Sequence, residues 1–302
     1  MGEWDLAASV QIARVKPVLC QVPNLAGILC IGSAALGYAD YFSDVDLLCI
    51  WSAPLARPER YLLARQINDA NAPAPQQIHG GRFDLDRLRI DNREVELLHV
   101  TLSTLDHHIH TLLNDPSFDS LPVDCYGLWQ PLPWLQYGIP ITTIEPDLQE
   151  LQRLARNPPE NLWERIITLQ FNRLRMPVLY HLYKAAMRGD SLFLHTVLED
   201  IVTRLLCILF AFHHRFFPST RWAIYEMEKL PAKPKHFTER LIALEQTPSA
   251  FSRDLLPAIG QLLLEVSQIV VPWFPDAVPA WAQDESNQLL RHRDIQQTSV
   301  ST

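Results

Sequence analysis

The sequence has no hydrophobic run long enough to cross a membrane. Its longest apolar stretch, Leu205–Phe212, is far shorter than the ~20 residues that a transmembrane helix needs, and Arg204 and His213 flank it. The N-terminus also lacks the basic and then apolar pattern of a signal peptide. We therefore expect a cytoplasmic protein without a membrane partner.

Cysteine is scarce as well. Five cysteines are spread over 302 residues, and no two of them form a C-x-x-C pair. An odd number at wide spacing does not give a disulfide framework. We expect reduced, mostly buried thiols, which is the usual state of cysteine in cytoplasmic proteins.

Positive charge is in deficit. The chain has 26 Lys and Arg against 34 Asp and Glu, a net charge of −8. Residues 1–146 hold 9 basic and 17 acidic side chains, whereas residues 147–302 hold 17 of each, so the whole excess of negative charge lies in the first half. Proteins that bind nucleic acid generally cluster positive charge to neutralise phosphates. The composition therefore argues against general nucleic-acid binding.

Hydrophobic patterning changes character along the chain. Short apolar runs predict strands over 27–32, 45–51 and 94–102, and helical spacing predicts helices over 5–22, 57–69 and 103–113. A proline-rich connector follows over 115–146. Beyond it, helical spacing alone is found over 160–188, 190–214, 236–245, 250–271 and 276–292. Within these elements, Pro17 and Pro177 are expected to break or kink their helices, and Ser103 to cap the helix that it begins.

This pattern predicts an α+β chain of two domains. We expect a small mixed-sheet domain with its connector over 1–146, an all-α domain over 147–295 and a polar tail over 296–302. His79-Gly80-Gly81 is typical of a turn within the first domain.

One segment combines a Gly-Ser corner with paired carboxylates. Gly32 and Ser33 follow the first predicted strand, and Asp44 and Asp46 open the second. Side chains alternate along a strand, so the two aspartates point to the same face. Carboxylates so close repel one another unless a cation lies between them, and oxygen ligands suit Mg²⁺. Gly32 would let the backbone approach a ligand closely, and Ser33 would offer a hydroxyl and an N–H to a phosphate.

A third carboxylate is expected from a neighbouring strand. Glu94 and Glu96 share one face of the predicted strand 94–102, and Glu96 is the more interior. We take Glu96 as the third ligand and Glu94 as its alternate. Three acids can hold one Mg²⁺ ion, or two ions about 3.5–4 Å apart, for in-line phosphoryl chemistry. Ser43, beside Asp44, is either a loop and cap residue or a contact of the metal or nucleotide.

These residues together resemble the signature of the nucleotidyltransferase superfamily of the DNA polymerase β type. That signature is a hydrophobic residue and Gly-Ser, a spacer, Asp-x-Asp, and a later strand with a third acid. Here the spacer over 34–43 has ten residues, and the resemblance covers Leu29–Leu98. The third acid is Glu, whereas Asp is commoner in the superfamily. The helical part is similar, more loosely, to the substrate-binding domain of small bacterial aminoglycoside and lincosamide nucleotidyltransferases.

The resemblance implies an enzyme that uses Mg²⁺ and a nucleoside triphosphate, with ATP as the expected one. A hydroxyl of a small-molecule acceptor would attack the α-phosphorus, and pyrophosphate would leave. Asp44, Asp46 and Glu96 would be the catalytic and metal-binding residues. The triphosphate would contact Gly32, Ser33, Ser43 and Arg221.

Several features of the helical half leave their roles open. Arg221 follows a proline turn in the segment 214–222, which is similar to one in bacterial relatives. It is either a solvated charge or a contact of the triphosphate or substrate. Glu199 and Asp200 lie on a predicted long helix and are candidates for a general base.

Three other functions compete with this hypothesis. One is a non-catalytic relative that senses nucleotides or binds a partner. Another is a nucleotidyltransferase of the toxin–antitoxin type, which modifies a protein. A kinase or phosphodiesterase is the third, but the sequence has no Walker or kinase motif.

Overall fold

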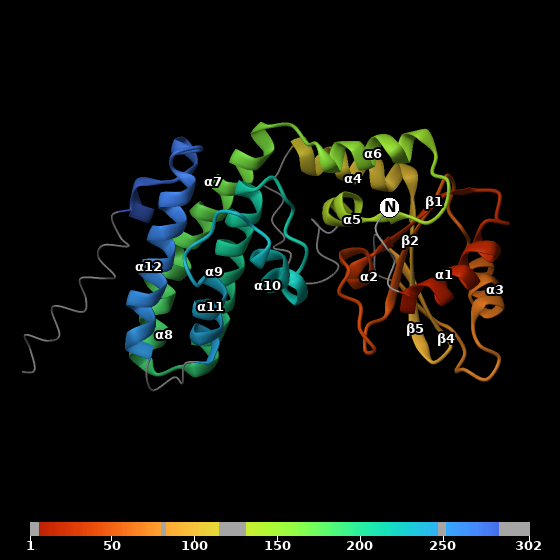
Figure 1. Ribbon diagram of the computed structural model, residues 1–302, viewed down its shortest axis with the longest axis horizontal. Coiled ribbons are helices and arrows are strands. Elements are labelled where there is room, and N and C mark those ends of the chain that lie inside the picture. Colours follow the sequence, from red (N-terminus) through yellow and green to blue (C-terminus); the bar gives the residue numbers. More distant parts are fainter. Residues whose placement is uncertain (1–5, 80–82, 115–130, 247–251, 284–302) are drawn as a thin grey trace, which may run out of the picture. The chain divides into compact units, whose positions relative to one another are not determined.

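The computed structural model describes residues 6–79, 83–114, 131–246 and 252–283 (Figure 1). Its chain forms two compact units, each treated by itself below. Among the described residues, the first unit comprises 6–114 and 131–159, and the second begins at Glu160. The boundary expected after residue 146 coincides with the start of helix α6 (Pro146–Arg156), which is part of the first unit.

A six-stranded mixed sheet forms the centre of the first unit. Its order is β3-β4-β5-β2-β1-β6; β2 and β5 are parallel, and every other neighbouring pair is antiparallel. The strands are β1 (Leu25–Ile31), β2 (Val45–Trp51), β3 (Gln76–His79), β4 (Asp84–Ile90), β5 (Arg93–Thr101) and β6 (Ile139–Pro140). The predicted mixed α+β fold is therefore confirmed.

Three strands agree with the sequence patterns, and three were missed. β1, β2 and β5 are the buried apolar runs, each within two residues of its predicted bounds. The hairpin of β3 and β4 was missed because β3 is mostly exposed and β4 places Asp86 beside Arg87, which breaks the apolar alternation. Instead of a plain connector, the described part of 115–146 contains α5 (Pro131–Tyr137) and the short β6.

Helices cover both faces of this sheet (Figure 1). α1 (Leu6–Leu19) and α3 (Arg57–Ile67) bury Val15 and Ala64 in one core with Val45, Leu47 and Val95. α4 (Leu102–Asn114), α5 and α6 pack together on the other face, where Gly27 of β1 lies against Leu148 of α6. The strands therefore carry alternating side chains into two separate cores.

Two predicted helix details are wrong. Pro17 does not break α1, because it lies in the last turn, and the helix ends two residues later. Ser103 does not cap α4, because the helix already begins at Leu102. The preceding residue, Thr101, caps the helix instead, because its Oγ1 accepts a hydrogen bond from the backbone N–H of Thr104 at 3.2 Å.

The described part of the second unit contains helices and no strand. Its elements are α7 (Asn161–Met176), the π-helical segment η1 (Pro177–Leu182), α8 (Tyr183–Arg188), α9 (Ser191–Phe212), α10 (Thr220–Glu228), α11 (Phe237–Gln246), α12 (Ser252–Val270) and the 3₁₀ turn η3 (Pro275–Ala277). The disruption expected at Pro177 takes the form of the π segment. The helix expected over 276–292 lies partly outside the described residues, as does the tail over 296–302.

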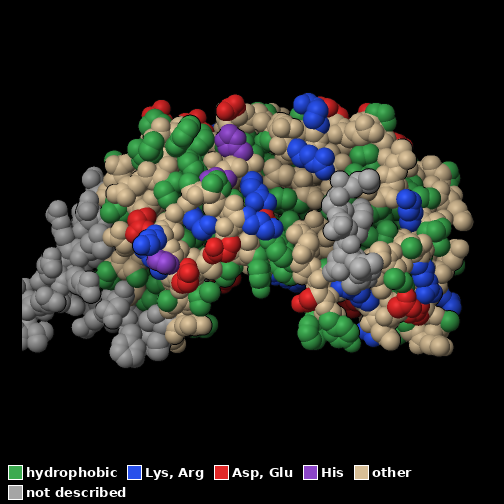
Figure 2. Space-filling model, viewed as in Figure 1, with side chains coloured by type: hydrophobic (Ala, Val, Ile, Leu, Met, Phe, Trp, Pro, Cys, Tyr) green, Lys and Arg blue, Asp and Glu red, His purple; other side chains and the backbone are tan. Residues whose placement is uncertain are grey.

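Within the described residues, none of the helices combines the length and apolar character that a membrane crossing requires. On the face that Figure 2 displays, acidic and basic side chains are interspersed. The described part of the first unit therefore does not offer on this face the one-signed stripe that a polyanion would favour.

A buried polar cluster lies on the α1 and α3 face of the sheet. Trp51 donates a hydrogen bond from Nε1 to His99 Nδ1 at 3.1 Å, and His99 Nε2 lies 3.2 Å from Asp86 Oδ2. The Arg60 guanidinium of α3 lies 3.0 Å from Asp84 and 4.0 Å from Asp86. Because Arg60 and Asp86 are both almost fully buried, their charges depend on one another.

Replacing Arg60 by Met should lower the free energy of unfolding by about 3–5 kcal/mol, since it removes the buried cation that faces the Asp84 and Asp86 carboxylates. Arg65→Met on the same helix is the matched control, because Arg65 is exposed. Its effect should stay within about 0.5 kcal/mol. Denaturant unfolding of both variants measures the difference; equal losses would contradict the role assigned to the cluster.

Candidate active site

The Gly-Ser corner joins β1 to the short helix α2 (Gly32–Leu36). Gly32 has a φ of +65°, in the left-handed region that favours glycine. A Cβ at this position would overlap Asp46 Oδ2. Glycine therefore serves two purposes here, because it turns the chain and lets the Asp46 carboxylate lie against the backbone.

Ser33 is buried in the first turn of α2, with 4% of its surface exposed. It is not the N-cap, because Ile31 occupies that position. Its Oγ has no hydrogen-bond partner among the described residues. A buried hydroxyl without a partner is costly, so this atom is suited to donate to an oxygen of a bound ligand.

The carboxylates come from the loop before β2, from β2 itself and from β5. One ligand atom from each of Asp44, Glu94 and Glu96 can be chosen so that all lie within 4.8 Å of one another. The parallel register pairs Asp46 directly with Glu96. Asp46 and Glu96 are register partners, as the predicted set requires, but the tight group consists of Asp44 with both glutamates, and Asp46 is turned toward Gly32.

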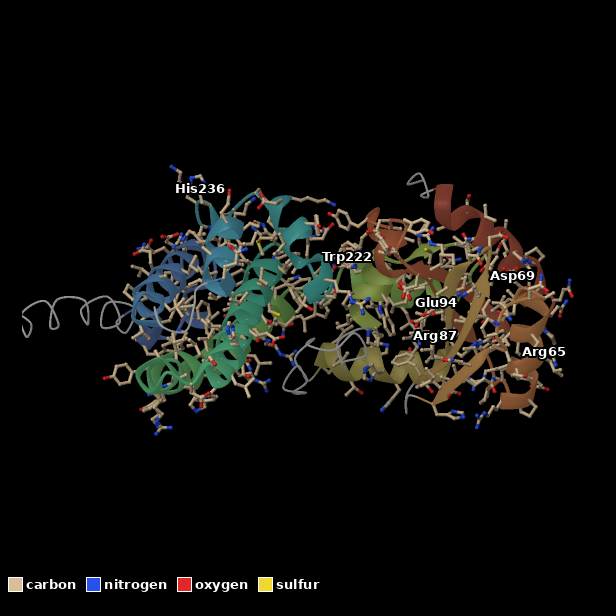
Figure 3. The ribbon with its side chains drawn as sticks, turned by 90° about the horizontal axis from the view of Figure 1, so that it is seen from below. Arg65, Asp69, Arg87, Glu94, Trp222 and His236 are labelled. Carbon is tan, nitrogen blue, oxygen red and sulfur yellow. The ribbon has the colours of Figure 1, made fainter. Side chains whose placement is uncertain are left out.

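An arginine that the sequence reasoning missed completes this cluster. Arg87 Nε lies 2.9 Å from Oε1 of Glu94 and 2.9 Å from Oε1 of Glu96. Figure 3 shows Arg87 beside Glu94 at the same edge of the first unit. Arg87 is on β4, the strand that the sequence patterns did not predict, so no signal linked it to the acids.

A second arginine holds the loop that leads into Asp44. Arg93 donates hydrogen bonds from Nε to the Ser43 carbonyl at 2.8 Å and from Nη2 to the Asp40 carbonyl at 2.6 Å. At the tip of this loop, Tyr41 and Phe42 are 91% and 90% exposed. The loop is therefore pinned at its base and presents two aromatic rings to solvent.

The Ser43 hydroxyl is engaged within this loop. It donates to Asp40 Oδ1 at 2.8 Å and accepts from the Asp40 N–H at 2.9 Å. The hydrogen bond from Ser43, followed by bonds from backbone N–H groups, lowers the pKa of Asp40. The structure thus places Ser43 as a loop-ordering residue next to Asp44, with its donor already used.

Cys30 lies shortly before the Gly-Ser corner, but its thiol is unreactive. Burial and then the negative charge of Asp46 raise the pKa of its thiol to about 12. It remains protonated at neutral pH and is not a nucleophile.

The donor chemistry fits a hard divalent cation. The acids offer oxygen ligands only, which is the preference of Mg²⁺, and Glu96 is almost fully buried. The single positive charge of Arg87 is shared by two carboxylates, Glu94 and Glu96, so this pair of acids retains negative charge that a cation would neutralise.

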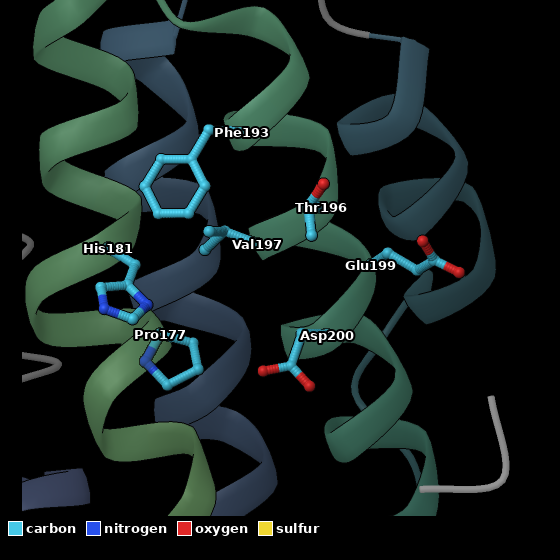
Figure 4. A pocket seen from close by; sticks show the side chains of 7 residues that line it. All are labelled: Pro177, His181, Phe193, Thr196, Val197, Glu199 and Asp200. Carbon is cyan, nitrogen blue, oxygen red and sulfur yellow. The ribbon is translucent and has the colours of Figure 1, made fainter.

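The remaining candidates lie in the second unit. Arg221 is exposed in the first turn of α10. Glu199 and Asp200 help to line a cavity of about 310 Å³ between η1 and α9, shown in Figure 4. The full lining is Pro177, His181, Phe193, Thr196, Val197, Glu199 and Asp200. Cavities of this volume are at the lower end of the range for small-molecule sites.

Asp200 forms an ion pair with Arg204. Its Oδ1 lies 2.7 Å from Nη2 of the buried Arg204. Burial and then the charge of Arg204 lower the pKa of Arg173, and Asp200 opposes this effect. Asp200 therefore pairs with Arg204 and offsets the repulsion between the two arginines, which is a structural role.

Gly32→Ala and Gly37→Ala form a matched pair. Both glycines have positive φ, so both variants should lose about 1–2 kcal/mol through backbone strain. Nothing lies within 4 Å of a Cβ at Gly37, whereas one at Gly32 displaces Asp46. We expect Gly32→Ala to cost more in unfolding and to weaken Mn²⁺ binding, which calorimetric titration can measure. Equal effects would contradict the close approach of Asp46.

Asp200→Asn should lower the free energy of unfolding by about 1–3 kcal/mol, because it leaves a buried charged donor poorly paired. Glu199→Gln, on the adjacent exposed position, is the control and should be neutral. Chemical denaturation distinguishes them. A stable Asp200→Asn protein would show that Arg204 does not depend on this carboxylate.

Comparisons with known proteins found a matching family model and similar solved structures. A domain of unknown function, DUF4037, matches residues 142–223, which run from the end of the first unit into the second. No curated protein matches the sequence. Among solved structures, a nucleotidyltransferase-like protein from Exiguobacterium sibiricum 255-15 is similar, with a TM-score of 0.43 and 15% identity over 88% of this chain and 80% of that chain. Neither likeness assigns a reaction, which has to be argued from the site.

Proposed function

We propose that the chain is a Mg²⁺-dependent nucleotidyltransferase. It transfers a nucleoside monophosphate, AMP from ATP, to a hydroxyl of a small-molecule acceptor and releases pyrophosphate. The observation that carries the proposal is the convergence of Asp44, Glu94 and Glu96 beside the Gly32–Asp46 contact. A buried, unpartnered Ser33 hydroxyl at the same corner adds a donor for a phosphate oxygen.

Each residue has a distinct task in this proposal. Asp44, Asp46 and Glu96 hold the ion or ions, with Glu94 as a further ligand or as a support for Arg87. When bound, Mg²⁺ neutralises charge on the triphosphate. Ser33 donates from Oγ to a phosphate oxygen, and Gly32 keeps the backbone close to that position. The pinned loop from Asp40 to Asp44 fixes one acid before any ligand arrives.

Nucleotidyl transfer depends mainly on how the triphosphate and the acceptor hydroxyl are positioned. The acceptor oxygen forms a bond to the α-phosphorus as the bond to pyrophosphate breaks, and the hydroxyl proton passes to a nearby base. A site that orients both partners and surrounds them with fixed charges supplies most of the rate. The sheet provides this, because Asp46, Glu94 and Glu96 stand on the paired strands β2 and β5, and Asp44 ends the loop that Arg93 pins.

A non-catalytic nucleotide sensor is the second candidate, and one observation favours it. Arg87 already forms ion pairs with two of the acids, as expected of a site that no longer binds a metal ion. Incubation with labelled triphosphates, Mg²⁺ and a panel of acceptors separates the two functions. Pyrophosphate release supports transfer, binding without turnover supports the sensor, and release of phosphate instead would point to a kinase or phosphatase.

Asp46→Asn should abolish turnover while it leaves the fold intact, because the amide keeps the shape and loses the charge. Asp106→Asn on the exposed surface of α4 is the control and should retain the full rate. Pyrophosphate release gives the rate, and circular dichroism checks the fold. An undiminished rate for Asp46→Asn would exclude its role as a ligand.

A further inference from the structure

The guanidinium of Arg87 contacts two carboxylates of the candidate site, those of Glu94 and Glu96. Besides the contacts of Nε, its Nη2 lies 2.5 Å from Oε1 of Glu96, so two donors of one side chain converge on a single buried oxygen. Charge-assisted bonds of this kind are among the strong ones in proteins. In this geometry, Arg87 holds Glu94 and Glu96 together.

The sheet register explains why Arg87 reaches both acids. In the antiparallel pair of β4 and β5, Arg87 stands directly opposite Glu96, and Arg89 stands opposite Glu94. Directly opposed side chains lie within contact distance, and the diagonal neighbour is reachable by a long side chain. Arg87 therefore makes one direct and one diagonal ion pair, and Glu94 offers it a second carboxylate near the first.

Glu96 differs from Arg87 and Glu94 in the solvent exposure of its side chain. The Glu96 side chain is 6% exposed, whereas the side chains of Arg87 and Glu94 are 35% and 39% exposed. A buried carboxylate needs a positive or hydrogen-bonding partner at all times. The guanidinium can shift toward solvent and stay with Glu94, but Glu96 has no comparable route to water.

We propose that Arg87 is a resident counter-ion that competes with the divalent cation for Glu96. Without the ion, Arg87 bridges the two glutamates and relieves their repulsion. When the ion binds at Asp44 and Glu96, the two positive charges repel one another, and Arg87 withdraws to Glu94 alone. This inference rests on the proposed function, because it assumes that the acids hold a cation, and it makes Arg87 a regulator of how tightly they do so.

Competition predicts a signature that a permanent structural ion pair does not. Removing a competitor should tighten metal binding while it destabilises the metal-free protein, because Glu94 and Glu96 then repel one another. Removing a support for the ligands should weaken binding and stability together. The sign of the change in metal affinity therefore decides between the two roles.

The experiment compares the full-length wild type with Arg87→Gln and Arg89→Gln. Arg89 is exposed on the same strand, opposite Glu94, and loses the same charge when replaced, so it controls for the loss of a nearby positive charge without the loss of the hydrogen bonds to Glu96. Isothermal titration with Mn²⁺ gives the Kd, and thermal unfolding is followed with and without Mn²⁺. Neither measurement depends on turnover or on knowledge of the acceptor.

Arg87→Gln should bind Mn²⁺ between about tenfold and a hundredfold more tightly, the scale set by lost charge-assisted hydrogen bonds. Its Tm should fall without Mn²⁺ and recover with it, and Arg89→Gln should resemble the wild type in both. An Arg87→Gln affinity that is unchanged or weaker overturns the competition and leaves the metal site standing. If none of the three proteins binds Mn²⁺, the metal site and the competition both fall.

Discussion

Repulsion between carboxylates is the constraint around which the first unit is organised. β2 and β5 run parallel, and their register sets Asp46 beside Glu96, with Asp44 and Glu94 two residues before each on the same face. Isolated acids at such spacing would push the strands apart or take up protons. Two features of the fold relieve this repulsion. Arg87 from β4 contacts both glutamates, and Gly32 makes room for Asp46.

The remaining charge is what makes the site chemically useful. Arg87 carries one positive charge and pairs with two glutamates, so its charge does not balance theirs, and the proposed function places a cation beside them. In the proposed competition, a divalent ion and Arg87 are alternative partners for the same oxygen of Glu96, and exchange between them would change the charge that faces a phosphate. The Arg87–Glu96 ion pair and the proposed metal site would therefore be two alternative states of the same carboxylate.

Much of this arrangement could be predicted from sequence because it is local. β1, the Gly-Ser corner and β2 follow one another within 27 residues, from Leu25 to Trp51, and hydrophobic runs define them. The pairing of β5 with β2 is not local, yet alternation within β5 placed Glu96 on the correct face. Where the patterns failed, the strand was mixed in character: β4 carries buried Asp86 next to Arg87, and a period-two search does not recognise that.

Asp86 also explains why β4 departs from the simple pattern. On one face of the strand, Arg87 serves the carboxylates of β5; on the other, Asp86 meets Arg60 and His99 inside the core. A slip of one residue in the pairing of β4 with β5 would turn both charges to the wrong side, leaving Asp86 away from Arg60 and Arg87 in an apolar core. Two polar clusters on opposite faces thus specify a single register. The register that buries Asp86 with Arg60 is also the one that delivers Arg87 to Glu96, so the stability of the core and the electrostatics of the site are set by the same strand pairing.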